Sequence, residues 1–322
     1  PEHQNPVRTT KTSGSTGEPL EMRVGHLSSV FYTCFSLREM KWLIKEPNLK
    51  STVIKANISE YLESDSWGQP YDSAMPTGKF QAIPIVTDIK EINRLLNEFQ
   101  PNMLLAYPNT LKGLCDEWKN NGFSLTDLKY IRTMGETLTQ ELRDYVFSIT
   151  NLIIHDAYSS QEVGCLAIQC PDNNEQYHTM DENVIVEILD DDNKPVGENE
   201  VGKVVITDLH NFVAPIIRYQ NGDYATRGYK CTCGRGLNTI KNVMGRSRNL
   251  LHHPDGRKHW PLIGFHSFFE IAPVTRFQLI QHTINDLELK LATPDTITDE
   301  QKAKFIETVR TNVGADFNVS LT

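Results

Sequence analysis

A Gly/Ser/Thr-rich run near the start of the chain has the composition of a phosphate-binding loop. It reads Thr12-Ser13-Gly14-Ser15-Thr16-Gly17-Glu18-Pro19. Its glycines permit tight backbone turns, and its hydroxyl and backbone N–H groups can surround phosphate oxygens. The run matches neither the GxxxxGK[ST] pattern of a Walker loop nor the GxGxxG pattern of a dinucleotide-binding fold. A flexible Ser/Gly linker has the same composition, so the run alone leaves both interpretations open.

Three later segments carry charged side chains next to glycine. The first follows a predicted strand and reads Tyr158-Ser159-Ser160-Gln161-Glu162-Val163-Gly164. Its Glu162 has two interpretations: a ligand of Mg²⁺ beside substrate phosphates, or a surface residue that caps a helix. The second is Tyr219-Gln220-Asn221-Gly222-Asp223, where Asp223 accepts bonds from ribose hydroxyls or belongs to an ordinary turn. The third is Gly245-Arg246-Ser247-Arg248-Asn249. This segment has two interpretations: a hinge whose Arg246 contacts the nucleotide, or a basic turn exposed to solvent.

Four side chains have the types that hold structural zinc. Cys170 and His178 are eight residues apart, and Cys231 and Cys233 form a C-x-C-Gly knuckle. Three thiolates and one imidazole would close a tetrahedral zinc site with no position left for water. The alternative is a pair of buried thiols and a surface histidine. Six cysteines in 322 residues are too few for a disulfide scaffold and favour a reducing compartment, the cytoplasm.

Composition and charge narrow the classes of function. With 39% hydrophobic and 23% charged residues, the 322-residue chain has the composition of a globular protein. A net charge of −9 disfavours nonspecific binding to nucleic acid, which requires neutralised phosphates. The chain has no apolar stretch near the roughly 20 residues of a membrane span. We therefore expect no nucleic-acid partner and no membrane partner.

The hydrophobic pattern predicts an α/β fold. Strands and helices alternate between residues 52 and 155, which indicates a mainly parallel sheet with crossover helices. Asp88 is expected to cap the helix that runs to Phe99. After residue 164 short strands follow one another, among them Val184–Leu189, Gly202–Thr207 and Ile216–Tyr219, which predicts a smaller sheet or distorted barrel beside the first unit. A β-β-α-β order after Gly245 predicts a small α+β lid, with the hinge at Gly245–Asn249.

Taken together in this order, the four glycine-containing segments resemble the adenylate-forming superfamily of acyl-CoA synthetases and adenylation domains. Two further patterns resemble the phenylacetate–CoA ligase branch. One is Pro215-Ile216-Ile217-Arg218-Tyr219 before Gly222-Asp223, and the other is Cys231-Thr232-Cys233-Gly234-Arg235 before Gly245-Arg246. The resemblance runs from Thr9 to about Leu321. It implies an incomplete nucleotide- and acid-binding adenylation core over residues 1–245 and an incomplete lid over residues 246–322.

The resemblance also implies roles for individual residues. Glu162, as the Mg²⁺ ligand, and Arg246 would be catalytic, Tyr107, Pro108 and Tyr158 would form the acid pocket, and Phe99-Gln100-Pro101 would help to shape it. Similar Cys/His sets in this family favour zinc at Cys170, His178, Cys231 and Cys233. The residues implied to contact the nucleotide are Thr12, Ser13, Gly14, Ser15, Thr16, Gly17, Gly135, Glu136, Ala157, Tyr158, Ser159, Asp223 and Arg246.

The implied activity is that of an AMP-forming acid–thiol ligase. It would use ATP and Mg²⁺ to convert a carboxylic acid, aryl or otherwise hydrophobic, into an acyl-adenylate. CoA or the phosphopantetheine thiol of an acyl carrier protein would then accept the acyl group. Acyl transfer to an amine or hydroxyl, and a noncatalytic nucleotide-binding module, are the alternatives.

Two departures from the family pattern lead to further expectations. The family has a large segment before its phosphate loop, and it supplies a lysine from a late loop of the lid. In this chain the last lysine is Lys304, inside a predicted helix. We therefore expect a chain truncated at both ends that lacks the adenylation lysine. Arg248-Asn249 also stands where an acidic pair is common at the hinge.

Overall fold

The computed structural model describes residues 6–11, 21–246, 250–259, 261, 268, 271–314 and 316–322. By its contacts the chain divides into two compact units, Pro1–Gly245 and Arg246–Thr322. The sections that follow describe each unit by itself.

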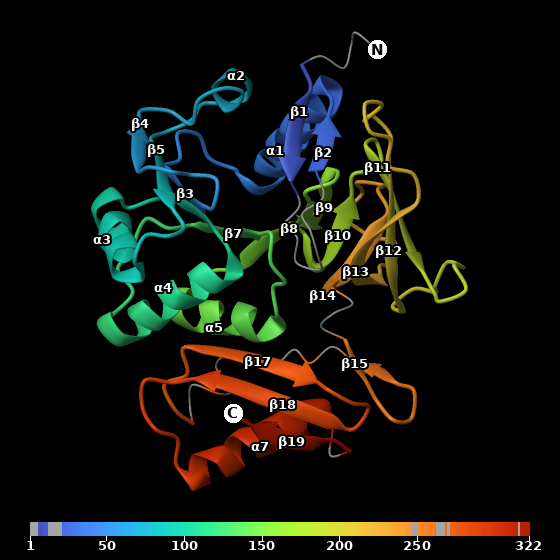
Figure 1. Ribbon diagram of the computed structural model, residues 1–322. Helices are drawn as coiled ribbons and strands as arrows, with labels where there is room; N and C mark the ends of the chain where they lie inside the picture. Colours follow the sequence, from blue (N-terminus) through green and yellow to red (C-terminus); the bar gives the residue numbers. More distant parts are fainter. Residues whose placement is uncertain are drawn as a thin grey trace. The chain divides into compact units, whose positions relative to one another are not determined.

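The central part of the first unit alternates strands with helices, as the sequence predicts (Figure 1). Its strands β3, β5, β6, β7 and β8 pair in parallel, with β3 between β5 and β6. Helix α3 follows β5, α4 follows β6 and α5 follows β7. The bounds are β3 Ser51–Lys55, β5 Phe80–Pro84, α3 Ile89–Phe99, β6 Met103–Ala106, α4 Pro108–Asn121, β7 Tyr130–Met134, α5 Gln140–Thr150 and β8 Ile154–Ser160.

Local sequence signals fix where these crossover helices begin and end. The Asp88 side chain accepts from Lys90 N at 2.9 Å, which confirms the predicted cap of α3, and Gln100 ends that helix in the left-handed region at φ 50°. Pro108 occupies the first turn of α4, where its missing N–H leaves no helical bond unmade. Thr139 caps α5 through Leu142 N at 3.2 Å.

A buried apolar layer joins the three helices to one face of the parallel strands. Trp118 at the end of α4 is 1% exposed and packs edge-to-face against Phe123. The layer fixes the strands in register and so fixes the residues that follow them. Its fully buried members include Ile54, Ile83, Ile92, Leu96, Leu104, Leu111, Leu114, Ile131 and Val146.

The β-rich region continues the same sheet, which differs from the separate sheet or barrel expected from the sequence. Strand β8 pairs in parallel with β7 and antiparallel with β9, so it joins the two regions. The twelve strands run in the order β11-β12-β13-β14-β10-β9-β8-β7-β6-β3-β5-β4. The added strands are β4 Leu62–Ser64, β9 Gly164–Cys170, β10 Asn173–Thr179, β11 Val184–Leu189, β12 Val201–Asp208, β13 Tyr219–Arg227 and β14 Thr239–Arg246.

One strand begins later in the chain than the sequence predicts. The apolar run Ile216–Tyr219 was expected to form a strand, but β13 begins only at Tyr219. Arg218 precedes it in the left-handed region at φ 47°, which extended pairing does not permit. The polar segment after the run therefore forms the strand itself, with consequences for Asp223 that are described below.

Helix α1, His26–Leu43, follows a two-stranded ribbon of β1, Arg8–Lys11, and β2, Glu21–Val24. Phe35 of α1 is 3% exposed and joins the buried cluster of the β-rich region. The short helix α2, Tyr71–Ala74, lies between β4 and β5 in the chain. Among the described residues, no helix is long and apolar enough to cross a membrane.

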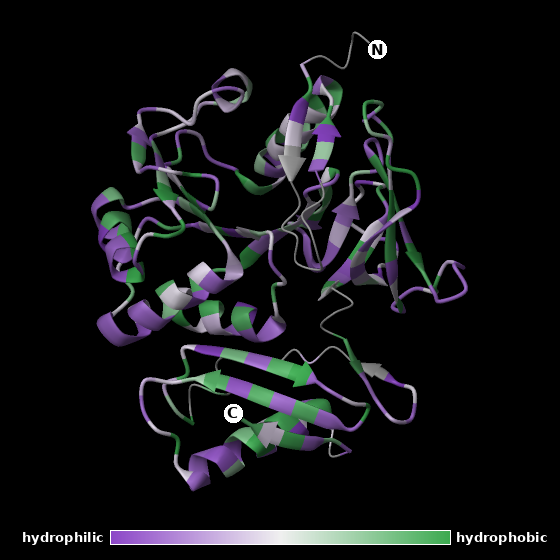
Figure 2. Cartoon of the chain, in the orientation of Figure 1, coloured by the Kyte–Doolittle hydropathy of each residue, from purple (hydrophilic) through white to green (hydrophobic). Residues whose placement is uncertain are grey.

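The second unit has the predicted β-β-α-β order. Strands β17, Arg276–Gln281, and β18, Asp286–Ala292, pair antiparallel, helix α7 spans Asp299–Val313, and β19, Asn318–Leu321, returns parallel to β18. Figure 2 shows β17 and β18 alternating between hydrophilic and hydrophobic residues, as expected for a sheet with one buried face. Thr298 and Gln301 form a capping box at the start of α7. An antiparallel pair of short strands, β15 Leu251–His252 and β16 Lys258–His259, precedes the sheet in the chain.

Candidate nucleotide site and metal centre

Parallel pairing brings several of the predicted site residues to one edge of the sheet. Ala106 pairs with Thr133, and Met134 pairs with Ala157. The carboxyl ends of β6, β7 and β8 therefore lie side by side, and open α/β sheets bind ligands at this edge. Tyr107, Pro108, Gly135 and Glu136 follow the ends of β6 and β7, whereas Ala157, Tyr158 and Ser159, predicted to follow a strand that ends at His155, lie within the last residues of β8.

Tyr107 and Gly135 are in close contact at this edge. Gly135 has a φ of 80°, and a Cβ built on it would lie 2.9 Å from Cε1 of Tyr107. Any side chain at residue 135 would therefore be strained and would displace the ring. Next to this contact, the carboxylate of Glu136 accepts from Asn109 N at 3.0 Å and so ties the end of β7 to the start of α4.

Tyr158 and Asp223 each lie at a β-bulge. Between Tyr158 and Ser159 the register with β9 shifts, because Leu166 is an extra residue on that strand. Opposite β12 the register also shifts, so that Asn221, Gly222 and Asp223 face one residue. Gly222 adopts a φ of 84° there. The expected Gly-Asp turn is thus a bulge within β13, and bulges redirect side chains and are frequent beside active sites.

These bulges bring Tyr158 and Asp223 into contact, although three strands separate β8 from β13 in the sheet. The Tyr158 hydroxyl donates to Asp223 Oδ2 at 2.7 Å. Asn221 Nδ2 donates to the Tyr158 oxygen at 2.7 Å and to Asp223 Oδ2 at 2.9 Å, while Asp223 N donates to Asn221 Oδ1 at 3.0 Å. Burial, followed by the charge of Asp223, raises the pKa of Tyr158 well above its ordinary value, so the phenol remains a donor.

Asn221 is a residue that the sequence interpretation did not single out. Its side chain is 6% exposed and joins Tyr158 to Asp223. Its position two residues before Asp223, next to a glycine, is the one sequence signal that points to it, because asparagine side chains commonly bond to the backbone two residues on.

Glu162 lies in the turn between β8 and β9, and it is 6% exposed. It follows Tyr158 by four residues in the chain, and its charge is one of the influences that raise the pKa of that phenol. The structure therefore gathers Tyr158, Glu162 and Asp223, which come from two separate motifs, in one region of the first unit.

The remaining predicted site residues are described only in part. Thr12, Ser13, Gly14, Ser15, Thr16 and Gly17 lie outside the described residues. Of Arg246 the structure describes the backbone, at the end of β14. Phe99-Gln100-Pro101 precedes β6, whereas Tyr107 follows it. A four-residue strand spans about 13 Å, so this segment lies at the opposite end of the strand from the pocket it was expected to shape.

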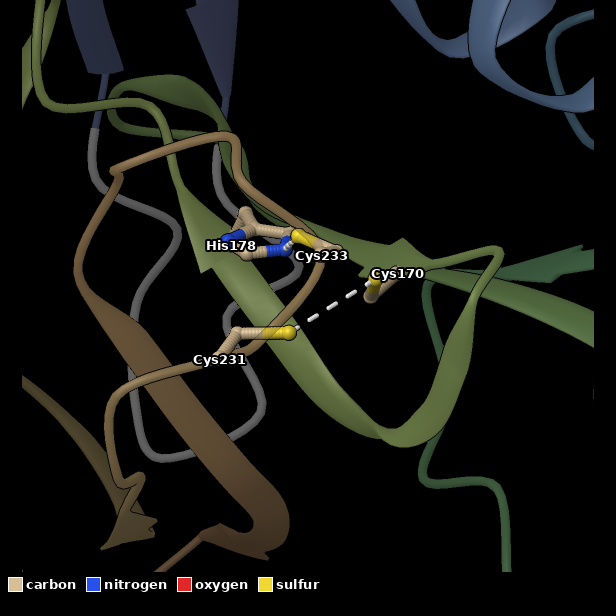
Figure 3. A group of neighbouring side chains, drawn as sticks. All are labelled: Cys170, His178, Cys231 and Cys233. Carbon is tan, nitrogen blue, oxygen red and sulfur yellow. Dashed lines mark hydrogen bonds between the residues drawn. The ribbon is translucent and has the colours of Figure 1, made fainter.

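The four candidate zinc ligands come together (Figure 3). Cys170 ends β9 and His178 lies on β10, while Cys231 and Cys233 lie on the loop between β13 and β14. Their ligand atoms all lie within 4.8 Å of one another. Cys170 Sγ is 3.9 Å from Cys231 Sγ, and Cys233 Sγ is 3.2 Å from His178 Nε2.

These separations fit a tetrahedral zinc ion. Zinc bonds of about 2.3 Å to sulfur and about 2.0 Å to nitrogen put tetrahedral ligand atoms roughly 3.5–3.8 Å apart. Burial raises the pKa of the Cys170 thiol to about 11, so a cation must lie beside this sulfur for it to ionise near neutral pH. Burial also lowers the pKa of His178, which favours the neutral imidazole that binds metal. The residues present therefore fit zinc.

Arg235 supplies a positive charge next to this cluster. Its Nη1 lies 3.6 Å from Cys170 Sγ and 2.6 Å from Asp172 Oδ2, and its guanidinium lies over the Trp42 ring at 4.8 Å. Burial raises the pKa of the Cys233 thiol, but hydrogen bonds from Arg235 outweigh this, and the net shift is downward. Three thiolates around Zn²⁺ carry a net charge of −1, which a neighbouring arginine offsets.

Comparisons with known proteins agree with this geometry. No family model matches the chain. Two proteins named phenylacetate–coenzyme A ligase, from Thermus thermophilus and Pseudomonas putida, are each 26% identical to it over 163 residues, 49% of this chain. Each match spans 37% of the relative, so the matched part is little more than a third of its length.

Solved structures resemble nearly the whole chain. A 2-hydroxyisobutyryl-CoA ligase in complex with its acyl-AMP matches 98% of the chain, at a TM-score of 0.74 and 15% identity, and the match covers 70% of that structure. An anthranilate CoA ligase with anthranoyl-AMP matches 99% of the chain, at a TM-score of 0.71 and 13% identity, over 63% of its length. The chain therefore has the fold of the adenylate-forming ligases and is similar in sequence to the phenylacetate–CoA ligase branch of that superfamily.

Proposed function

We propose that the protein activates a carboxylic acid with ATP and transfers the acyl group to a thiol. The observation that carries the proposal is the convergence of Tyr158, Glu162 and Asp223 beside the carboxyl ends of β6, β7 and β8. These residues belong to the segments that resemble the adenylate-forming superfamily. Sequence similarity to two phenylacetate–CoA ligases supports the same reaction class.

The reaction consists of two displacements. An oxygen of the carboxylate attacks the α-phosphorus of ATP, the bond to the bridging oxygen breaks, and pyrophosphate leaves with the electron pair. The thiol then attacks the acyl carbon of the adenylate, loses its proton, and releases AMP. Neither step needs a protein nucleophile, so the residues of the site act by positioning the reactants and neutralising charge.

Individual side chains have distinct roles in this proposal. Asp223, held by Tyr158 and Asn221, accepts hydrogen bonds from the ribose hydroxyls. Glu162 holds Mg²⁺, which neutralises phosphate charge when bound. Gly135, Glu136, Ala157 and Ser159 line the nucleotide site, with Thr12–Gly17 on the phosphates and Arg246 as a second nucleotide contact. Tyr107, Pro108 and Tyr158 border the acid.

We further propose that Cys170, His178, Cys231 and Cys233 hold one structural zinc ion. All four positions of a tetrahedral ion would be taken by side chains, which leaves none for a reacting water. Zinc there would tie the β9–β10 hairpin to the loop that follows β13, the strand of Asp223. The six free cysteines fit a reducing compartment such as the cytoplasm, where we place the protein.

The acceptor is identified by its product. The complete protein is incubated with ATP, Mg²⁺ and a panel of aryl and aliphatic acids, and CoA, phosphopantetheinylated carrier protein or an amine is added in parallel. We expect a thioester with CoA or the carrier, detected by mass spectrometry together with stoichiometric AMP. An amide in place of a thioester would assign acyl transfer to nitrogen, an activity named for one structural neighbour, an amide bond synthetase from Marinactinospora thermotolerans.

A further inference from the structure

A lysine lies at the same sheet edge as the candidate acid pocket. Lys55 is the last residue of β3. Val53 pairs with Leu105, Leu105 with Arg132, and Arg132 with His155, so these four residues form one row on one face of the sheet. Because side chains alternate between faces along a strand, the next row on that face holds Lys55, Tyr107, Met134 and Ala157. Tyr107 keeps extended backbone angles and continues this row.

The charges on this face do not balance. Glu39, from α1, accepts from Arg132 Nε at 2.9 Å, and the two side chains are only 11% and 12% exposed. The carboxylate of Glu39 is thus committed to Arg132. Within the described part of the chain, no carboxylate lies within ion-pair distance of the Lys55 ammonium. We call Glu39, Lys55, Arg132 and His155 the Lys55 cluster.

Three titratable groups in or near the Lys55 cluster, His155, Tyr32 and Cys165, are neutral, and the charges of Arg38 and Arg143 also act on this region. Burial, followed by the charge of Arg132, lowers the pKa of His155 to about 4, so the imidazole is uncharged at neutral pH. Burial raises the pKa of both Tyr32 and Cys165, which keeps the phenol and the thiol protonated. Burial, followed by the charge of Arg132, lowers the pKa of Lys55, and the charge of Glu39 opposes this shift. An anionic ligand group there would offset this desolvation.

We propose that Lys55 binds a second anionic group of the acid substrate, so that the preferred substrates are dicarboxylic or similarly doubly anionic acids. The inference rests on the proposed function, because it assumes that Tyr107 and Ala157 border the acid. The acid would lie along this row, with its reacting carboxylate towards Ala157 of β8 and its second anionic group at Lys55 of β3, three strands away in the sheet. Lys55 is then a specificity-determining residue.

The first test compares acids of matched size. Adipate with hexanoate, and terephthalate with benzoate, are assayed for acid-dependent pyrophosphate exchange. We expect kcat/KM to favour the diacid of at least one pair by tenfold or more. In Lys55→Met this ratio should fall at least tenfold, whereas Lys55→Arg should retain most of it. Lys90→Met, which removes an exposed lysine of α3, serves as the matched control and should leave the ratio as it is.

The second test does not depend on turnover. Reductive methylation of Lys55 is followed by mass spectrometry in the presence of adipate or of hexanoate. Adipate should slow the labelling of Lys55 and not that of Lys90, and hexanoate should have little effect. Three outcomes would overturn the inference. They are equal labelling of Lys55 with both acids, no preference for the diacid in either pair, and an equal fall in kcat/KM for both acids of a pair in Lys55→Met. If no acid supports exchange, the proposed function fails, and the labelling experiment still decides whether Lys55 binds a diacid.

Discussion

The hydroxyl of Tyr158 donates to Asp223 Oδ2 at 2.7 Å and so joins strands β8 and β13, which are not neighbours in the sheet. Two bulges make this contact possible, one beside each residue. The bond, with Asn221 as the third member, fixes the carboxylate that we assign to the ribose. In the proposed function, Tyr158 would therefore act on nucleotide binding through Asp223, in addition to any contact of its own.

Tyr158→Phe should weaken ATP binding more than it affects the chemical step. The substitution removes one donor to Asp223 and the acceptor of one Asn221 bond. The loss of a buried hydrogen bond of this kind is worth about 1 kcal/mol, or roughly fivefold in the KM for ATP. Steady-state kinetics at saturating acid measure the effect, with Tyr130→Phe as a control at the start of β7. A kcat reduced with an unchanged KM for ATP would show that Tyr158 acts elsewhere.

Removal of metal should destabilise the first unit. Metal analysis of protein purified in reductant should give one zinc per chain, and chelation should lower the melting temperature by several degrees as the metal is lost. Cys233→Ser should do the same, because it removes one of the four clustered ligands. Cys34→Ser, at an exposed free cysteine, is the control. Protein that contains no zinc, or that melts unchanged with chelator, would refute the metal assignment.

Glu39→Gln should be strongly destabilising. It keeps the shape of the side chain but leaves the buried guanidinium of Arg132 without its counter-charge. Loss of one partner of a buried ion pair commonly costs about 3 kcal/mol, measurable as the free energy of unfolding in urea. Glu91→Gln, in the exposed pair with Arg94, is the matched control and should change stability little. Equal effects of the two substitutions would mean that burial of the Glu39–Arg132 pair has no energetic consequence.

Two neighbouring residues should give opposite dependences of stability on pH. Burial raises the pKa of Asp156 to about 6, so the stability it contributes is complete below about pH 4 and is lost as pH rises through 6. Burial lowers the pKa of His155 to about 4, so its contribution is complete above about pH 6.5 and is lost as pH falls through 4. In the wild type the two dependences largely cancel between pH 5 and 6.

Single substitutions should separate these contributions. Between pH 5 and 6, His155→Gln should lose about 1 kcal/mol of stability with rising pH relative to the wild type, and Asp156→Asn should gain a comparable amount. Urea unfolding at the two pH values provides the measurement. Parallel pH profiles for all three proteins would show that neither group has the shifted pKa on which this prediction depends.

The sequence predicted the parallel region well because its signals are local. Asp88 and Pro108 mark helix starts, and short apolar runs such as Met103–Ala106 mark buried strands. The β-rich region was predicted less well. Strand β10 contains Asn173, Asn174 and Glu175, and no apolar alternation marks it. It pairs with β14, which is distant in the chain, and one sequence alone does not reveal such pairing.

In the candidate site, too, the features that depend on local signals were predicted and those that depend on distant pairing were not. The positions of Tyr107 and Gly135 follow from strand ends, and the Cys/His spacing led to a cluster that the structure brings together. The bond from Tyr158 to Asp223 and the role of Asn221 depend on two bulges, and the sequence suggested a turn at one of them. The unbalanced charge of Lys55 is apparent only once Glu39 is known to pair with Arg132.

The most direct test of the proposed function is acid-dependent exchange between ATP and radiolabelled pyrophosphate in the complete protein. Exchange reports the reversible formation of the acyl-adenylate whatever the final acceptor is. We predict exchange that requires both Mg²⁺ and a carboxylic acid, and that falls by at least a hundredfold in Asp223→Ala. Nucleotide binding without exchange, across broad panels of aryl, aliphatic and dicarboxylic acids, would contradict the assignment as an adenylate-forming ligase.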